Sequence, residues 1–250
     1  MIDRFVLPEW LAPDDLDWFE RNHFGRAPCA RPGGATEATS LCTWETLAEV
    51  LGSELPVDVL TVAAGKTVEV RPPRSHADVM RMMKTGVSTV VRAAEKHVAG
   101  LARLAERFER VLPGEVHVQL YATPAGTNSY GWHYDFEDVF IAQTAGVKDY
   151  YFRANTVARD AVLGDNLNFT SFRNERSPLM SARLIAGDWL YLPARWWHLV
   201  KCVEDSLSIS VGVMSPGELQ RARRLPAGWT GDRRAGGAGT PPGLAAPGGE

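Results

Sequence analysis

Cysteine is scarce in this chain of 250 residues, and no two cysteines form a CxxC pair. The three that occur, Cys29, Cys42 and Cys202, are far apart in the sequence. So sparse and odd a set argues against a disulfide framework and against a zinc ribbon. With 45% apolar residues, eight tryptophans and nine phenylalanines, the chain has enough material for a core that needs no cross-links.

The sequence also lacks a large excess of charge of either sign and lacks long apolar runs. Its 27 basic and 30 acidic residues give a net charge of −3, so neither a nucleic-acid partner nor an anionic membrane surface is predicted. No stretch approaches the roughly 18–20 apolar residues of a membrane span. The N-terminal sequence MIDRFVLPEWLAPDD has no basic segment before an apolar run. We therefore expect no signal peptide and a reducing, cytoplasmic location.

Residues 1–114 have the mixed pattern of an α/β region. Residues able to cap a helix precede apolar stripes at several points, and one run of β-branched residues is bounded by turn signals. We expect this region to pack on a barrel formed by the rest of the chain. The predicted elements are helices starting at 13–15, Thr43 and Ser75, an amphipathic helix over 97–111, a hairpin around Ala64-Gly65 and a strand over Val87–Arg92.

Residues 115–215 consist of short runs rich in β-branched and aromatic residues, separated by Gly, Pro and Asp. This spacing is typical of an antiparallel sandwich or barrel, and a jelly roll belongs to that class. The expected fold class is therefore mainly β with flanking helices. Strands are predicted at Val116–Ala122, Val139–Gln143, Lys148–Arg153, Leu184–Leu192, His198–Val203 and Leu207–Val213.

Two segments fit none of these strands. Residues 154–183 are polar and weakly patterned, and a connection of this length inside a domain is usually functional or mobile. We interpret it as a lid over the substrate, with a solvated loop without a role as the alternative. After a short predicted helix at 216–225, residues 226–250 are mostly Gly, Pro and Ala. That composition predicts a disordered tail.

The sequence Gly-Trp-His-Tyr-Asp at 131–135 is the first candidate for chemistry. In an extended segment the side chains alternate, so His133 and Asp135 face the same way. His198 closes the block Gly-Asp-Trp-Leu-Tyr-Leu-Pro-Ala-Arg-Trp-Trp-His and supplies a second imidazole. Two histidines and one carboxylate on one face of a metal suit iron(II) that also binds an oxo acid and dioxygen. A structural zinc site would close all four positions.

An isolated HxD pair is common by chance, so the motif alone does not establish a metal site. Lys148 is a second residue that favours one. It follows His133 by 15 residues, across a predicted hairpin at Ala145-Gly146, so its ammonium is expected to enter the same cavity. A buried lysine needs a carboxylate partner, which the far end of 2-oxoglutarate supplies. The alternative is an exposed lysine after a turn. Glu137 and Asp138 are either part of a turn or partners for a cationic substrate group.

Two blocks of sequence carry a resemblance to a known family. They are VHVQLYATPAGTNSYGWHYDFEDVFIAQTAGVKDYYFR at 116–153 and LIAGDWLYLPARWWHLVKCVEDSLSISVGV at 184–213. Both resemble the core of JmjC oxygenases of the cupin type, in particular the ribosomal oxygenases and the asparaginyl hydroxylase of the hypoxia pathway. The resemblance implies a double-stranded β-helix over 115–215.

The resemblance also implies roles for individual residues. His133, Asp135 and His198 would bind iron(II), and Lys148 would bind the distal carboxylate of 2-oxoglutarate. Tyr121 matches a tyrosine that helps to bind this co-substrate, and Gln119 stands where the family often has Asn. Asp138 and Ile141 fall where relatives line the pocket.

The implied activity is hydroxylation of a C–H bond with dioxygen, giving succinate and carbon dioxide as co-products. The substrate would be a peptide, a protein side chain or an amino-acid-like molecule, and the sequence does not identify it. Three alternatives stay open: an inactive cupin-type binding module, an N-methyl demethylase of the same family, and a metal cupin with other chemistry, such as an isomerase or a cysteine-type dioxygenase. The oligomeric state is likewise not predicted.

Overall fold

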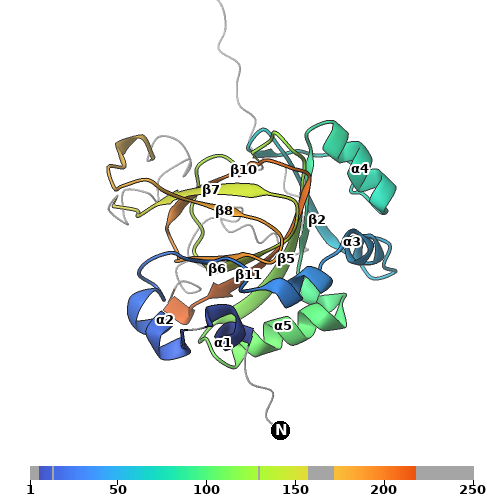
Figure 1. The fold of residues 1–250 in the computed structure, drawn as a ribbon. Coiled ribbons are helices and arrows are strands. Elements are labelled where there is room, and N and C mark those ends of the chain that lie inside the picture. Colours follow the sequence, from blue (N-terminus) through green and yellow to red (C-terminus); the bar gives the residue numbers. More distant parts are fainter. Residues whose placement is uncertain (1–5, 13, 129, 157–171, 218–250) are drawn as a thin grey trace, which may run out of the picture.

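A computed structural model describes residues 6–12, 14–128, 130–156 and 172–217. Figure 1 shows two β-sheets that face each other, with helices outside the larger one. All pairings between named strands are antiparallel. This is a double-stranded β-helix, so the predicted fold class is confirmed. In spatial order, the larger sheet contains β1 (Cys29–Arg31), β9 (Trp189–Leu192), β6 (Asp138–Ala145), β11 (Ser206–Met214), β5 (Glu115–Thr123), β4 (Ser88–Arg92), β2 (Asp58–Ala63) and β3 (Lys66–Thr67), and the smaller contains β10 (Trp197–Cys202), β7 (Lys148–Arg153) and β8 (Met180–Leu184).

Three helices begin where the sequence predicted, because a side chain caps each of them. Asp15, Thr43 and Ser75 each accept a hydrogen bond from the backbone amide three residues further on. No helix among the described residues is long and apolar enough to cross a membrane. The helices are α1 (Val6–Leu11), α2 (Leu16–Asn22), α3 (Trp44–Leu51), α4 (His76–Lys84) and α5 (Ala99–Glu109), with short 3-10 helices η1 (Thr36–Ser40), η2 (Ala94–Lys96) and η3 (Phe172–Asn174).

The two faces of the larger sheet differ in polarity. On the outer face, Val118, Leu120 and Ile209 belong to the main apolar core. On the inner face, Tyr121 of β5 lies opposite Ser208 of β11, and the alternation along both strands continues with other polar residues. The barrel interior is therefore polar along these two strands, and the apolar face is turned toward the helices.

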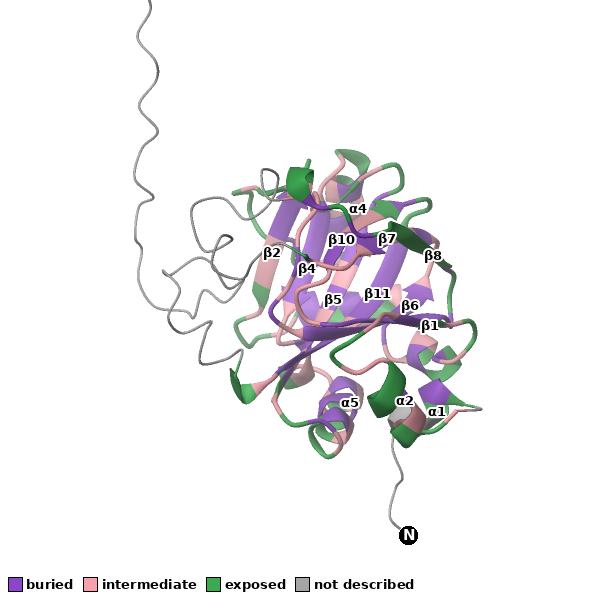
Figure 2. Ribbon diagram, turned by 90° about the vertical axis from the view of Figure 1, so that its left-hand side faces the viewer, coloured by how far each residue is buried: buried purple, intermediate pink, exposed green. Residues whose placement is uncertain are grey.

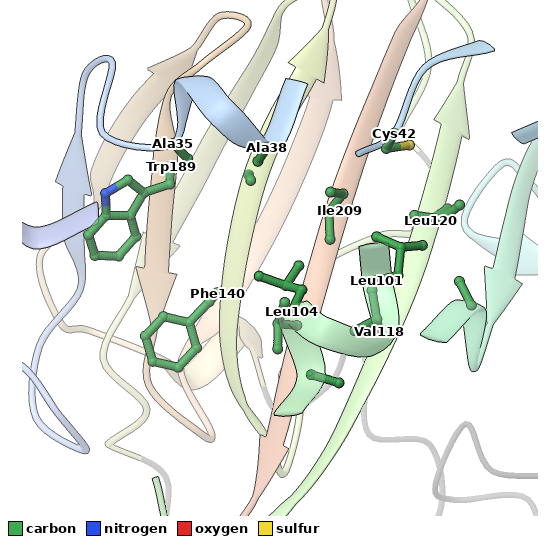
Figure 3. Close-up of a cluster of buried hydrophobic side chains, with 14 of the residues drawn as sticks. Ala35, Ala38, Cys42, Leu101, Leu104, Val118, Leu120, Phe140, Trp189 and Ile209 are labelled. Atoms are coloured by element: carbon green, nitrogen blue, oxygen red, sulfur yellow. The ribbon is translucent and has the colours of Figure 1, made fainter. Parts of the chain in front are cut away.

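The outer core lies between the larger sheet and helix α5. Leu101 and Leu104 of α5 lie over the sheet and belong to the same buried cluster as Phe140 and Trp189 (Figure 3). Phe108 of the same helix meets Phe140 edge to face, with ring centroids 4.9 Å apart. Figure 2 shows that the inward sides of the helices are buried whereas their outward sides are exposed. The packing of helices on this face is what keeps the sheet closed to water there.

The predicted strand over Leu184–Leu192 is wrong, because two strands in different sheets share this stretch. Strand β8 ends at Leu184 and β9 begins at Trp189. Between them Gly187 adopts a φ of 94°, which favours glycine. The carboxylate of Asp188 then accepts hydrogen bonds from the amides of Ile185 and Gly33, at 3.0 and 2.7 Å. The chain therefore turns sharply from the smaller sheet into the larger one.

Residues 1–114 do more than pack on the barrel, because they supply β1, β2, β3 and β4 to the larger sheet. Strand β1 was not predicted. Its three residues pair with β9, and so short a strand leaves no periodic signal in the sequence. The predicted helix at 216–225 lies mostly outside the described residues, and the tail 226–250 lies wholly outside them.

We expect the substitution Leu101→Ala to lower the free energy of unfolding by about 2–5 kcal/mol, because it leaves a cavity in the outer core. Leu101 has no exposed surface. Urea unfolding followed by circular dichroism measures the change. Leu55→Ala is the matched control, since 62% of that side chain is exposed. Equal effects of the two substitutions would contradict the assignment of this core.

Candidate metal centre

His133 and Asp135 lie on the segment that joins β5 to β6, and their side chains point the same way. The residues that alternate with them, Tyr134 and Phe136, are buried on the opposite side. There Tyr134 meets Trp197 edge to face, with ring centroids 4.9 Å apart. Two buried rings thus fix which way the segment faces, and the predicted alternation of the histidine and the aspartate is confirmed.

His198 reaches the same place from strand β10. Its backbone and that of His133 exchange two hydrogen bonds, of 3.1 and 2.8 Å, in an isolated antiparallel bridge. The two imidazole rings lie 4.1 Å apart, and Nε2 of His198 lies 3.5 Å from Oδ2 of Asp135. One donor atom from each of the three residues lies within 4.8 Å of the others. The structure therefore brings the three predicted ligands together.

Both imidazoles are oriented by the backbone. Nδ1 of His133 lies 2.8 Å from the carbonyl oxygen of Gly131, and Nδ1 of His198 lies 3.1 Å from that of Trp196. A carbonyl only accepts hydrogen bonds, so each Nδ1 carries the proton and each Nε2 keeps its lone pair. Hydrogen bonds of this kind to the second ring nitrogen are typical of metal-binding histidines.

The donor set fits a divalent metal with open coordination positions. Burial, and then the neighbouring His133, lower the pKa of His198 to about 4, so its ring is neutral at physiological pH. The side chain of Asp135 is 44% exposed, so the group is open on one side. Two imidazoles and one carboxylate on one face are the donors that non-haem iron(II) takes in oxygenases.

The turn before β10 is hydrogen-bonded to the backbone of Asp135. The amide of Arg195 donates a 2.7 Å hydrogen bond to the carbonyl of Asp135. Arg195 adopts a φ of 68°, a left-handed conformation that is uncommon for a residue other than glycine. The guanidinium of Arg195 also lies 5.0 Å from the centre of the Phe136 ring. A strained turn that contacts a candidate ligand fits a functional role.

Asp138 does not line the barrel interior, contrary to what the resemblance implied. It is opposite Val213 in the sheet, on the face that packs against the helices. Its buried carboxylate accepts hydrogen bonds from the hydroxyl of Tyr191 and from the amide of Ala194, the latter at 3.3 Å. The carboxylate therefore supports the 193–195 turn. Ile141, which the resemblance also placed in the pocket, does face inward, in a second apolar cluster.

Lys148 points into the barrel, where 3% of it is exposed. Its Nζ donates a 2.9 Å hydrogen bond to Oγ of Ser208 and lies 5.8 Å from the centre of the Tyr121 ring. Tyr121 in turn donates from its hydroxyl to Oε1 of Gln119, at 2.9 Å. Burial lowers the pKa of Lys148 to about 8. The alternative of an exposed lysine is therefore wrong, and Lys148 of the smaller sheet faces Tyr121 and Gln119 of the larger sheet across the barrel interior.

Two residues of this group were missed by the sequence analysis. Ser208 contacts Lys148, and the buried Tyr150, whose pKa is raised mainly by burial, is hydrogen-bonded to the same serine. The signal that points to them is alternation. Tyr150 stands two residues after Lys148, and Ser208 lies in the run Ser-Leu-Ser-Ile-Ser of β11, whose serines share one face.

The connection from β7 to β8 covers most of the segment interpreted as a lid. Residues 157–171 of it lie outside the described residues. At its base, the carboxylate of Glu175 accepts hydrogen bonds from the amide and the hydroxyl of Thr156, at 2.8 and 2.6 Å. The ring of Phe172 stacks on Trp132, with centroids 4.1 Å apart, so this base contacts the segment that carries His133.

A double-stranded β-helix with an open two-histidine, one-carboxylate group inside it defines the class of cupin-type metal-binding proteins. The family model of the JmjC domain matches residues 93–220, which is just over half of the chain. The chain therefore belongs to the JmjC-domain family, and the resemblance stated from the sequence is confirmed.

Individual relatives are similar at modest identity. A protein of Drosophila pseudoobscura pseudoobscura, named bifunctional lysine-specific demethylase and histidyl-hydroxylase NO66, is 23% identical over 218 residues, 84% of this chain and 23% of its own length. Ribosomal oxygenase 1 of Gallus gallus is 30% identical over 95 residues, 38% of this chain and 16% of its own length. The chain thus spans less than a quarter of either relative.

Among solved structures, the Escherichia coli ribosomal oxygenase YcfD in complex with cobalt and 2-oxoglutarate has the same fold. The TM-score is 0.61 at 19% identity, and the match covers 93% of this chain and 63% of that chain. At this identity the likeness establishes the fold.

We expect the substitutions His133→Ala, Asp135→Ala and His198→Ala each to weaken metal binding by about 100-fold or more. Replacing even a residue that only hydrogen-bonds to a metal ligand lowers the metal affinity of a protein by about 10–100-fold. Titration with cobalt(II), followed by calorimetry and visible absorption, measures the change. The control is His76→Ala, an exposed histidine on α4. Unaltered cobalt affinity in any one folded variant of the three would remove that residue from the site.

Proposed function

We propose that the chain is an iron(II)- and 2-oxoglutarate-dependent oxygenase that hydroxylates a C–H bond of a peptide, a protein side chain or an amino-acid-like molecule. Succinate and carbon dioxide are the co-products. The observation that carries the proposal is the pairing of two features on one inner surface. These are the open group of His133, Asp135 and His198, and the buried ammonium of Lys148.

Each feature alone admits other functions, but together they favour this one. A two-histidine, one-carboxylate group binds metals for many reactions. Among the described residues, the hydroxyl of Ser208 is the one hydrogen-bond partner of the buried ammonium of Lys148, and such a group is costly unless an anion joins it. A dicarboxylate that binds the metal at one end and the ammonium at the other satisfies both requirements. The structure of YcfD with cobalt and 2-oxoglutarate supports this reading, because that protein has the same fold.

The chain's own residues bind and orient the reactants. Lys148, with Ser208 and Tyr121 beside it, holds the distal carboxylate of 2-oxoglutarate by charge-assisted hydrogen bonds. His133, Asp135 and His198 hold the metal. Iron(II), when bound with 2-oxoglutarate and dioxygen, supplies the oxidising power for hydroxylation. The backbone carbonyls that accept from both Nδ1 atoms keep the imidazoles in the binding orientation.

A second candidate function is removal of an N-methyl group, which begins with hydroxylation of that group. The name of the NO66 relative combines lysine-specific demethylase with histidyl-hydroxylase. The same site serves both outcomes, because they differ in which C–H bond lies next to the metal. The inactive binding module is disfavoured, since three complete ligands and a buried lysine are present. A cytoplasmic location and the absence of nucleic-acid and membrane partners stay predictions.

The test of the proposed function is the consumption of 2-oxoglutarate. We expect the iron-loaded chain to convert 2-oxoglutarate to succinate in the presence of dioxygen, and the Asp135→Ala variant to do so at background level. Mass spectrometry of peptides incubated with the chain separates the two outcomes: one added oxygen indicates hydroxylation, and loss of a methyl group indicates demethylation. If the folded, metal-loaded chain produced no succinate, the oxygenase function would be contradicted and the inactive binding module would be the remaining function.

We expect Lys148→Ala to weaken 2-oxoglutarate binding by tens-fold or more, because truncating one partner of a buried charge pair costs about 2–5 kcal/mol. The dissociation constant is measured by calorimetry on the cobalt-loaded protein without dioxygen. Lys201→Ala is the matched control, since Lys201 lies on the neighbouring strand β10 and is exposed. Similar affinities for the Lys148→Ala variant and the native chain would show that the co-substrate lies elsewhere.

The affinity for 2-oxoglutarate should also fall above pH 8. The pKa of Lys148 is lowered to about 8 by burial, and the bound carboxylate requires the charged ammonium. Below pH 8 the charge is present in the free protein, whereas above it binding requires proton uptake and weakens by up to about tenfold per pH unit. Lys148→Arg is the control, because a guanidinium stays charged. A native profile that is flat from pH 7 to 9.5 contradicts this role.

A further inference from the structure

A hollow on the outside of the barrel lies between the segment after β3 and helix α4. Its volume is about 400 Å³, and its lining includes the side chains of Arg71, Arg74 and Arg81. Asp78 is the one acidic residue of this lining. Three positive charges against one negative charge gather here, although the chain as a whole carries a net charge of −3.

Asp78 is already engaged by its own helix. Its carboxylate accepts 2.9 Å hydrogen bonds from the amide of Arg74 and from the hydroxyl of Ser75, at the start of α4. It also pairs with the guanidinium of Arg81, three residues further on. The pKa of Asp78 is lowered, first by the hydrogen bond from the Arg74 amide. The acid thus completes the helix start and leaves the hollow with an excess of positive charge.

The guanidinium groups of Arg71 and Arg74 differ from that of Arg81. Both residues are exposed, and neither guanidinium has a hydrogen bond or a close ion pair with any residue that the structure describes, although the charge of Arg71 helps to lower the pKa of Asp78. Pro72 and Pro73 lie between them and fix two backbone φ angles. This restriction lowers the entropy that the two arginines lose when an anion binds between them.

The hollow flanks the part of the barrel that carries the metal ligands. Gly65, at the turn before β3, forms a backbone bridge with Tyr130. Gly86, just after α4, lies beside the Thr127 side chain. The two ends of the stretch from β3 to α4 therefore lie near Tyr130 and Thr127, a few residues before His133.

We propose that this hollow, the arginine pocket of Arg71, Arg74 and Arg81, binds acidic side chains of a protein or peptide substrate. The proposal rests on the proposed function and adds an anchoring site away from the reacting C–H bond. Guanidinium forks pair with carboxylates through two parallel hydrogen bonds. A substrate held both here and at the metal gains affinity from the linkage of the two contacts.

The features of the pocket favour a carboxylate-bearing peptide over a nucleic acid. A nucleic-acid surface combines a long basic stripe with aromatic rings that stack on bases. The lining of the arginine pocket includes no aromatic residue, and its charge is confined to one hollow.

The test measures binding of a fluorescein-labelled octaglutamate peptide to the full chain by anisotropy at low salt. We expect the double variant R71Q/R74Q to bind this peptide about tenfold more weakly, since two exposed charge pairs are lost. The matched control, R21Q/R26Q, removes two charges near α2, on the opposite side of the molecule from α4 (Figures 1 and 2). It should stay within about twofold of the native chain.

Three results would overturn the proposal: no loss in R71Q/R74Q, an equal loss in both double variants, or tighter binding of a labelled dT12 strand that depends on Arg71 and Arg74. Two further measurements separate this test from that of the proposed function. The His133→Ala variant should bind the peptide as the native chain does. Substrate-free turnover of 2-oxoglutarate should be unchanged in R71Q/R74Q. If the chain binds the peptide but does not turn over 2-oxoglutarate, the proposed oxygenase function is wrong and the arginine pocket is still supported as a binding site for acidic peptides.

Discussion

The backbone pairing of His133 with His198 joins two segments that are 65 residues apart in the sequence, and the geometry of the site follows from it. Two hydrogen bonds set the spacing of the imidazoles. Behind them Tyr134 packs on Trp197, so the residue after one ligand and the residue before the other share an apolar contact. Each Nδ1 donates to the carbonyl two residues earlier. The pairing therefore positions the ligands and brings together the rings that hold both segments in place, while the two carbonyls fix the tautomers.

The larger sheet is polar on its inner face along β5 and β11, whereas the outer face of the same strands is apolar. Gln119, Tyr121 and Ser208 point inward, while their neighbours in sequence point outward into the helix-covered core. Burying polar groups is costly, so the outer core with α5 must supply much of the stability. An interior that contributes less to stability is free to hold a buried ammonium such as that of Lys148. Fold and proposed function thus use opposite faces of the same strands.

Much of the fold and of the candidate site was predicted from local sequence patterns. Capping by Asp15, Thr43 and Ser75 acts over three residues, and the alternation of His133 with Asp135 acts over two, so each is visible in the chain itself. The sequence-based predictions were wrong where the contact that decides the structure joins residues far apart in the sequence. The stretch from 184 to 192 looked like one strand, but Asp188 binds the amide of Gly33 and turns the chain there. Asp138 was placed in the pocket, but Tyr191 holds it on the other face.

The sequence by itself determined which residue types the site contains, since a two-residue period and a short turn fix the relative directions of neighbouring side chains. It also determined the family, because the two motif blocks carry enough specific residues to be recognised. Only the tertiary structure decided that Ser208 and Tyr150 accompany Lys148, because they come from other positions of the barrel wall. It alone showed that the arginines before and on α4 line one hollow. Contacts between distant segments depend on strand register, and register is set by the packing of the whole sheet rather than by any local pattern.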